Sequence, residues 1–316
     1  MPLGEFDLIE RFFNRPTRRR DVLLGVGDDA ALLQVPPGRA LVAATDTLVE
    51  GRHFLPGAPP RSIGHQALAV NLSDLAAMGA EPAWALLSLS LPEPDERWLE
   101  GFADGLFALA DAHGVELVGG DTVRGPLVVT IEVLGFVDPA RALTRRGARP
   151  GDLLYVSGWP GESAAGLAAL LRGGSNDASD DPLVRRHLYA EPRLALGRAL
   201  AGSATSAMDV SDGLLGDLRK LCAASGVGAT LELDALPFSA ALVSRHSREE
   251  CEKFVLHGGD DYELLFTLPA DGSVPQESAG SPPLVRIGRI IEGDDVRCTR
   301  GGVDVADHGG GYDHFR

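Results

Sequence analysis

The chain has 316 residues, 44% of them hydrophobic, and a formal net charge of −16. This length and composition predict a folded protein with room for two domains. The acidic balance and the presence of only two lysines, Lys220 and Lys253, argue against nucleic acid as a partner. No apolar run reaches the ~18 residues that a bilayer span needs, and the first residues do not resemble a signal peptide. We therefore expect no membrane segment and a cytoplasmic location.

The first half of the chain predicts alternating helices and strands. Residues 5–14 place Phe6, Ile9 and Phe13 on one face of a short helix. Apolar runs broken by glycine, aspartate and proline predict strands that end before these breaks. The predicted strands are 22–26, 30–35, 40–44, 84–91, 115–118 and 127–137, and the longer helices are 61–78 and 95–113. The segment contains both α and β structure, with segregated strands.

A second domain is predicted after a break in the apolar pattern. Residues 138–152 are rich in arginine, glycine and proline, so we expect one domain over 1–138 and an α/β domain over 150–316. Strands are predicted at 153–157, 207–210, 229–233, 262–268 and 284–291, and helices at 162–171, 193–200 and 214–225. The fold class is mixed α/β, of the α+β type.

The cysteines carry no predicted chemistry. Cys222, Cys251 and Cys298 stand far apart, without a CxxC pair and without a neighbouring histidine. Neither a disulfide framework nor a zinc site is indicated. We expect buried or idle thiols.

A recurring set of aspartates is the most informative feature of the sequence. Each stands at the end of an apolar run beside glycine, serine or threonine, where a carboxylate can approach a ligand closely. They lie in the segments GDD (27–29), TDT (45–47), NLSD (71–74), GGDT (119–122), DVSDG (209–213) and GGDD (258–261). If these carboxylates converge, they repel one another unless cations neutralise them. Mg²⁺ prefers such oxygen ligands together with substrate phosphates, so the set predicts a nucleotide-phosphate site.

Each of these segments also has a plainer interpretation. Asp209 and Asp212 stand three apart at the entry of a predicted helix, where both could face one metal, but Asp212 could equally cap that helix. The segments around Asp29 and Asp46 could be an ordinary turn and an ordinary strand end. Asp74 lies on an apolar helical face, where an unpaired carboxylate is costly, so we interpret it as a metal ligand.

Other routes to a nucleotide or hydrolytic site find no support. GxxxxGK[ST] is absent, which excludes a P-loop. Residues 25–30 match GxGxxA, but the residues that follow predict a strand and not the helix of a dinucleotide fold. HExxH and GxSxG are absent as well, so a zinc peptidase and a serine hydrolase are not indicated.

Taken in order, these segments resemble the thiamine-monophosphate kinases, members of the aminoimidazole-ribonucleotide synthetase superfamily. The resemblance covers nearly the whole chain. The matching segments are GEF (4–6), LGVGDDAA (24–31), ATDTLVEGRH (44–53), AVNLSDLAAMGAEP (69–82), GGDTVRG (119–125), RALTRRG (141–147), DVSDGL (209–214), GGDDYEL (258–264) and GYDHF (311–315).

The resemblance implies a two-domain fold like that of aminoimidazole-ribonucleotide synthetase. The N-terminal domain would bind ATP and metal and pair with its copy in a homodimer, and ATP and substrate would bind at a cleft between elements of both domains. Implied magnesium ligands are Asp29, Thr45, Asp46, Asp74, Asp121, Asp209 and Asp212; implied nucleotide contacts are Gly120, Asp121, Arg145 and Ser211; implied substrate contacts are His53, Asp260 and Tyr312. The family usually has glutamate where this chain has Asp260, so that side chain is one methylene shorter.

The implied activity is ATP-dependent phosphorylation of thiamine monophosphate to thiamine diphosphate. Magnesium ions on Asp46, Asp121 and Asp212, with the cation of Arg145, would neutralise charge in a direct phosphoryl transfer. Two alternatives remain: another ATP-dependent enzyme of the superfamily, or a non-catalytic acidic cation binder. The chain lacks the cysteine near the N-terminus of selenophosphate synthetases and the terminal cysteine of hydrogenase-maturation proteins.

Overall fold

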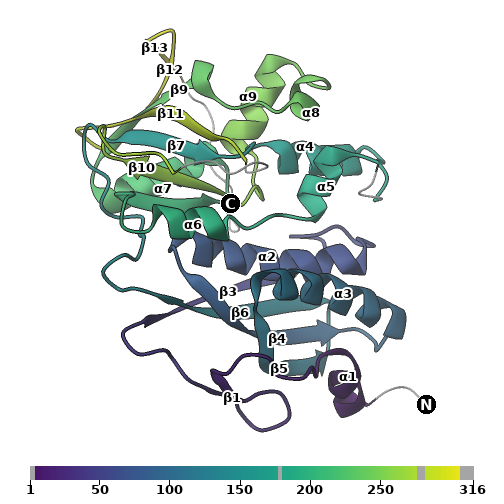
Figure 1. Ribbon diagram of the computed structural model, residues 1–316. Helices are drawn as coiled ribbons and strands as arrows, with labels where there is room; N and C mark the ends of the chain where they lie inside the picture. Colours follow the sequence, from purple (N-terminus) through teal and green to yellow (C-terminus); the bar gives the residue numbers. More distant parts are fainter. Residues whose placement is uncertain (1–3, 177–179, 276–281, 307–316) are drawn as a thin grey trace. The chain divides into compact units, whose positions relative to one another are not determined.

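The computed structural model describes residues 4–176, 180–275 and 282–306. The chain divides into two units, drawn in purple to blue and in teal to yellow in Figure 1. The N-terminal unit comprises residues 1–75 and 80–139, and the C-terminal unit comprises residues 76–79 and 140–316.

The N-terminal unit is built on a mixed sheet with helices on one face. Its elements are α1 (Glu5–Phe12), β1 (Val22–Leu24), β2 (Leu32–Leu33), β3 (Ala40–Val49), α2 (Pro60–Ala77), β4 (Glu81–Leu91), α3 (Glu96–His113), β5 (Glu116–Arg124) and β6 (Val128–Val137). Four strands pair in the order β3-β6-β4-β5, and only β4 and β5 run parallel. Helices α2 and α3 lie over this sheet, while β1 and β2 form a separate small hairpin (Figure 1).

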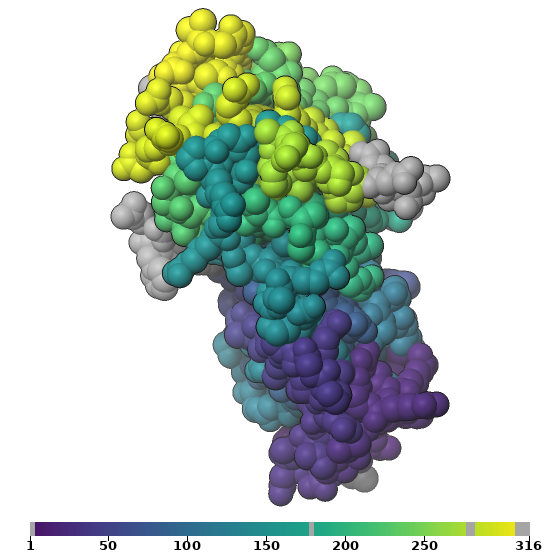
Figure 2. Space-filling model, turned by 60° about the vertical axis from the view of Figure 1, so that its left-hand side comes forward, coloured from purple at the N-terminus to yellow at the C-terminus, as the bar shows by residue number. Residues whose placement is uncertain are grey.

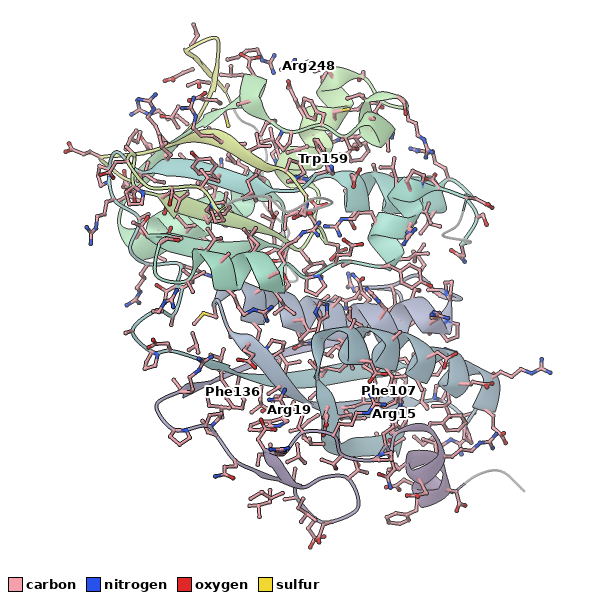
Figure 3. All side chains as sticks on the ribbon, in the orientation of Figure 1. Arg15, Arg19, Phe107, Phe136, Trp159 and Arg248 are labelled. Carbon is pink, nitrogen blue, oxygen red and sulfur yellow. The ribbon has the colours of Figure 1, made fainter. Side chains whose placement is uncertain are left out.

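Two glycines let α2 and α3 pack backbone against backbone. A Cβ atom on Gly105 would lie 1.9 Å from the carbonyl oxygen of Arg61, and one on Gly64 would lie 2.0 Å from that of Phe102. Neither position has space for a methyl group. Elsewhere in this unit the guanidinium of Arg15 lies 3.6 Å from the centre of the Phe107 ring, so the α1 region packs on α3 (Figure 3).

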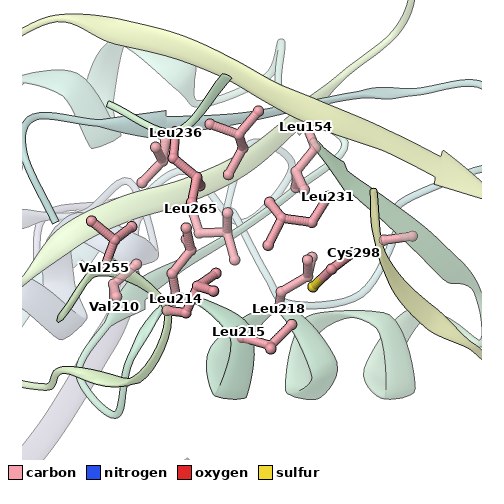
Figure 4. Close-up of a cluster of buried hydrophobic side chains, with 14 of the residues drawn as sticks. Leu154, Val210, Leu214, Leu215, Leu218, Leu231, Leu236, Val255, Leu265 and Cys298 are labelled. Carbon is pink, nitrogen blue, oxygen red and sulfur yellow. The ribbon is translucent and has the colours of Figure 1, made fainter. Parts of the chain in front are cut away.

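The C-terminal unit is built on a seven-stranded sheet. Its elements are β7 (Leu153–Ser157), α4 (Glu162–Leu171), α5 (Pro182–Leu188), α6 (Leu194–Leu200), β8 (Ser206–Val210), α7 (Leu214–Ser225), β9 (Gly228–Glu232), the 3₁₀ turn η1 (Leu233–Ala235), α8 (Ala240–Val243), α9 (Arg248–His257), β10 (Glu263–Leu268), β11 (Leu284–Ile291), β12 (Val296–Arg300) and β13 (Val303–Val305). The strand order is β13-β12-β9-β11-β7-β10-β8. The core lies between this sheet and α7, where Leu214 and Leu218 meet Leu231 and Leu265 (Figure 4).

A buried carboxylate joins three segments of this unit. Glu263, at the start of β10, has a side chain only 1% exposed. Arg186 of α5 donates to it at 2.7 Å and Arg193 donates at 2.5 and 2.7 Å. Ser157 donates a further hydrogen bond from the end of β7, at 2.5 Å. Burial alone would raise the pKa of Glu263, but the two guanidinium groups outweigh it and the pKa is lowered.

Most predicted elements are confirmed, with two informative errors. The sequence predicts strands that end before Asp46 and Asp121, but β3 and β5 continue through both residues. Strand pairing with β6 and β4 outweighs the break suggested by the polar residues. Helices α5, α8 and α9 and strands β12 and β13 were not predicted. The three cysteines are buried and unpaired with one another, as expected. Across the described ranges, none of the helices is long and apolar enough to span a bilayer.

We predict that Gly105→Ala lowers the free energy of unfolding by about 1–3 kcal/mol, because the added methyl group forces α2 and α3 apart. Gly101→Ala on the same helix is the matched control. Its Cβ would meet the Pro60 side chain at 3.2 Å and the Arg61 main-chain nitrogen at an ordinary 3.7 Å, so the gain in helix propensity of about 1 kcal/mol largely offsets the contact. Urea titration of both variants measures the difference, and equal stabilities would contradict the close packing.

A second prediction concerns pH. The pKa of Glu263 is lower in the folded protein than its ordinary 4.5, so its stabilising contribution is complete above pH 4.5 and is lost as the pH falls below it. Over the range from about pH 6 to pH 3, the stability difference between the wild type and Glu263→Gln should therefore stay level down to about pH 4.5 and shrink below it. Denaturant titrations across this range test it, with the exposed Glu249→Gln as the control for removing a carboxylate. A difference that stays constant with pH would show that Glu263 is not ionised in the folded protein.

Candidate functional site

Two of the predicted ligands of the N-terminal unit, Asp46 and Asp121, lie on the two edge strands of one sheet. Asp46 lies midway along β3 and is exposed. In the strand register Asp46 pairs with Ile131, Ile131 with Leu87, and Leu87 with Gly120. Three strand spacings, about 14 Å, therefore separate the main chains of β3 and β5. Asp46 and Asp121 are not neighbours within the unit.

His53 is brought toward Asp46 by a tight turn after β3. Glu50 and Phe54 form an isolated bridge, and the Val49 N–H donates to His53 Nδ1 at 3.0 Å. Although Asp46 is exposed, the surrounding chain desolvates its carboxyl group and raises the pKa, and the charge of His53 opposes the shift. A cation near Asp46 would relieve this penalty.

The remaining predicted residues of this unit come from a turn, a helix and β5. Asp29 is exposed in the segment between β1 and β2, where its N–H donates to Asp28 at 2.8 Å. Asp74 is half-buried on α2, next to the buried Ser73 and Leu75. At Gly120 a Cβ would lie 1.8 Å from the Leu87 carbonyl oxygen, so only glycine lets β5 follow β4 at this point.

In the C-terminal unit the segment between β8 and α7 holds Ser211 and Asp212. The buried carboxylate of Asp217 accepts hydrogen bonds from both of their N–H groups, each at 2.9 Å. Burial raises the pKa of Asp217, while Lys220 and the N–H donors partly offset the shift. Lys220 donates to Asp217 at 2.8 Å and also contacts the carboxylate of Asp212. The Asp217 carboxylate therefore holds the main chain of Ser211 and Asp212 in place.

The alternative that Asp212 caps α7 is wrong. The N-cap is Gly213, which has no side chain, and the carboxylate of Asp212 is directed to Lys220 instead. Asp209 is buried on β8, two residues before Ser211. Asp212 thus keeps a half-exposed carboxylate at a helix N-terminus.

The Gly258–Glu263 segment lies directly beside Ser211. The Asp260 N–H donates to the Ser211 carbonyl oxygen at 2.9 Å, and the Tyr262 N–H donates to that of Val210 at 2.8 Å. A Cβ on Gly259 would lie 2.6 Å from the Ser211 carbonyl oxygen, which explains a glycine there. Burial raises the pKa of Asp260, and the nearby His187 and the Tyr262 hydroxyl oppose the shift.

Arg145 lies elsewhere in the same unit. Its carbonyl oxygen accepts a hydrogen bond from Ser225, the last residue of α7, at 2.8 Å. Because α7 has 12 residues and a length of about 18 Å, the main chain of Arg145 and Asp212 stand at opposite ends of the helix. Tyr312 lies outside the described residues.

Within the described ranges, neither unit forms a complete metal cage by itself. Among the residues that the structure describes, no three histidine, cysteine or acidic side chains are grouped closely enough to hold an ion. The available donors are carboxylate and hydroxyl oxygens, which suit Mg²⁺. Mg²⁺ is usually held by one or two carboxylates while substrate phosphates and waters complete the coordination, so the arrangement fits an ion that binds together with a nucleotide.

Sequence reasoning missed Asp217 and Lys220. Asp217 reads as an ordinary surface acid in the first turn of a helix, yet it is fully buried. Its spacing of five residues from Asp212 gives no helical pairing signal. The scarcity of lysine was the available hint, since Lys220 is one of two in the chain.

Comparison with known proteins matches both units. The family described as AIR synthase related protein, N-terminal domain, matches residues 27–137, and the corresponding C-terminal domain matches residues 149–300. The Escherichia coli K12 thiamine-monophosphate kinase is 49% identical over 322 aligned residues, covering 100% of this chain and 99% of that protein. The Bacillus subtilis enzyme of the same name is 36% identical and covers 92% of each.

Solved structures of thiamine-monophosphate kinases also match this chain over most of its length. Thiamine-monophosphate kinase from Stenotrophomonas maltophilia K279a superimposes with a TM-score of 0.86 at 45% identity, over 96% of this chain and 99% of that one. A structure described as AaThiL complexed with AMPPCP and TMP has a TM-score of 0.79 at 33% identity, over 89% of each chain. The hydrogenase maturation protein HypE, at 22% identity and a TM-score of 0.73, shares the fold. The chain therefore belongs to the thiamine-monophosphate kinases, within the AIR synthase related proteins.

Proposed function

We propose that this chain transfers the γ-phosphoryl group of ATP to the phosphate of thiamine monophosphate, forming thiamine diphosphate and ADP. The relatives that match it from end to end carry this name, and a structural neighbour is described with AMPPCP and TMP bound. The observation that carries the proposal is the contact between Asp260 and Ser211. It joins the segment proposed to recognise the acceptor to the segment proposed to hold the nucleotide.

We assign the proposed residue roles from the oxygen donors that the N-terminal and C-terminal units provide. The magnesium ligands are Asp29, Thr45, Asp46, Asp74 and Asp121 in the N-terminal unit and Asp209 and Asp212 in the C-terminal unit; the nucleotide contacts are Gly120, Asp121, Arg145 and Ser211; the acceptor contacts are His53, Asp260 and Tyr312. Bound magnesium would supply charge neutralisation and alignment of the phosphates. Arg145, at the other end of α7 from Asp212, serves a different part of the extended nucleotide from the metal-bearing segment.

In the proposed transfer an oxygen of the acceptor phosphate bonds to the γ-phosphorus while the bond to the β,γ-bridging oxygen breaks. The electron pair of that bond leaves with ADP. Because the acceptor is already anionic near neutral pH, no side chain has to remove a proton from it. The task of the chain is to hold both reactants in line, with Ser211 and Asp212 fixed by Asp217.

A homodimer formed through the N-terminal unit completes the proposal. Leu41 on β3 and Val123 on β5 are 47% and 49% exposed at the two edges of the sheet. Leu23 and Leu32 of the β1–β2 hairpin are exposed as well, and this N-terminal part of the chain is drawn in purple in Figure 2. Apolar side chains on edge strands are typical of a surface covered by another chain.

We propose a cytoplasmic location for the enzyme.

We predict that Asp212→Asn lowers turnover by at least about a hundredfold, because it removes a metal ligand. The fold should persist, since the change opens no cavity and Asp217 still holds the segment. Steady-state kinetics and circular dichroism of the variant test this, with Asp294→Asn, in the exposed turn before β12, as the control. Wild-type turnover in a folded Asp212→Asn protein would remove the residue from the metal site.

The choice of acceptor is the sharpest test of the function itself. Thiamine offers no phosphate to share a metal ion, and its hydroxyl would need a base. We expect thiamine monophosphate to give thiamine diphosphate and ADP with magnesium present, and thiamine at the same concentration to give no product. Chromatography with mass detection identifies the products. Comparable conversion of both acceptors contradicts the proposed recognition, and absence of ADP with either would favour the cation-binder alternative.

A further inference from the structure

Two residues of the Gly258–Glu263 segment adopt a backbone conformation that side chains avoid. Asp260 has φ = 63° and Tyr262 has φ = 53°, both in the left-handed region, and within the described residues they are the only non-glycine cases. Such conformations persist only where the surrounding structure enforces them, and they cluster at functional sites. The two residues also contact each other, since the Tyr262 hydroxyl donates to Asp260 at 3.1 Å.

The residue between them is fixed through its side chain. The carboxylate of Asp261 is fully buried and accepts hydrogen bonds from the N–H groups of Gly161, at 2.7 Å, and Ser163, at 3.3 Å. These N–H groups belong to the first turn of α4, so Asp261 satisfies donors that a helix start leaves open. The residue between Asp260 and Tyr262 is therefore held by a helix end.

The same residue is fixed through its main chain by Arg186. One guanidinium nitrogen, Nη2, donates to the Asp261 carbonyl oxygen at 2.8 Å and to Glu263 at 2.7 Å. The Arg186 side chain is only 10% exposed. This single group therefore ties the peptide between the two left-handed residues to the buried carboxylate at the start of β10.

Glu263 is in turn anchored independently of Arg186. Arg193 makes two hydrogen bonds to it, and Ser157 makes a third. A Cβ atom at position 158 would lie 2.0 Å from the Glu263 carboxylate. The glycine there leaves the space that the Glu263 side chain occupies. Loss of Arg186 should thus release the Asp261 carbonyl while Glu263 stays paired.

We propose that Arg186 is a positioning residue for acceptor recognition: it holds the left-handed segment so that Asp260 presents its carboxylate to the acceptor. Arg186 does not itself contact the acceptor. This inference rests on the proposed function, in which Asp260 contacts thiamine monophosphate, whose thiazolium ring carries a positive charge. A carboxylate held in place by its backbone recognises such a cation with less loss of entropy than a mobile one.

The kinetic test is a double-mutant cycle of Arg186→Gln and Asp260→Asn. Arg186→Gln should raise the KM for thiamine monophosphate about tenfold and change the KM for ATP less than about twofold. In the Asp260→Asn background the same substitution should have less than about a twofold further effect, because Arg186 acts through Asp260. Arg300→Gln, which removes an exposed ion pair with Glu252, is the matched control. Equal changes in both KM values, or additive effects, would overturn the proposal.

Arg186→Lys provides a milder variant if Arg186→Gln does not fold. Arg186 Nη1 makes no hydrogen bond among the described residues, so a lysine could replace the contacts of Nη2 alone. We expect Arg186→Lys to restore most of the affinity for thiamine monophosphate. A lysine variant as impaired as the glutamine variant would contradict the assigned contact.

A second measurement does not depend on the substrate. The amides of Asp260 and Tyr262 are hydrogen-bonded to the carbonyl oxygens of Ser211 and Val210. Arg186→Gln should accelerate hydrogen exchange at these two amides and leave exchange in α7 unchanged. Unchanged exchange at both amides overturns the positioning role even if the wild type does not convert thiamine monophosphate, whereas an unreactive wild type with accelerated exchange contradicts only the proposed function.

Discussion

The C-terminal unit depends on a buried carboxylate held between two guanidinium groups. A carboxylate as deeply buried as Glu263 is tolerable only when it is paired and hydrogen-bonded, and Arg186, Arg193 and Ser157 meet that condition. These partners come from β7, α5 and the start of α6, so the pairing joins parts of the chain that are distant in sequence. The segment just before β10 takes its shape from this arrangement.

The sequence predicted most of this architecture because its apolar runs and glycine breaks follow ordinary periodicity. Through resemblance it implied a nucleotide contact at Ser211 and a substrate contact at Asp260, but not the direct main-chain contact between their two segments that the structure has. It could not predict that Asp46 and Asp121 lie within strands, since whether a polar pair ends a strand depends on the partner strand. Nor could it predict Asp217 or Glu263, whose roles arise from burial and from partners that the fold brings near.

The two units supply their oxygen donors in different ways. In the C-terminal unit Asp212 is paired with Lys220, so a metal ion bound there would have to compete with an ammonium group. In the N-terminal unit Asp46 and Asp121 stand on separate edge strands of one sheet, and Asp46 carries the electrostatic cost of desolvation. Both features favour binding of metal together with phosphate over binding of metal alone.

The close crossing of α2 and α3 has a consequence for preorganisation. The backbones of α2 and α3 meet so closely at Gly64 and Gly105 that a shift of one helix against the other is opposed by the facing carbonyl groups. Asp74 is carried on α2, three turns beyond that crossing. The main chain of Asp74 is therefore held in place by helix packing, and only its side-chain torsions can adjust. If Asp74 is a metal ligand, as proposed, the reorganisation energy of binding at this position is small.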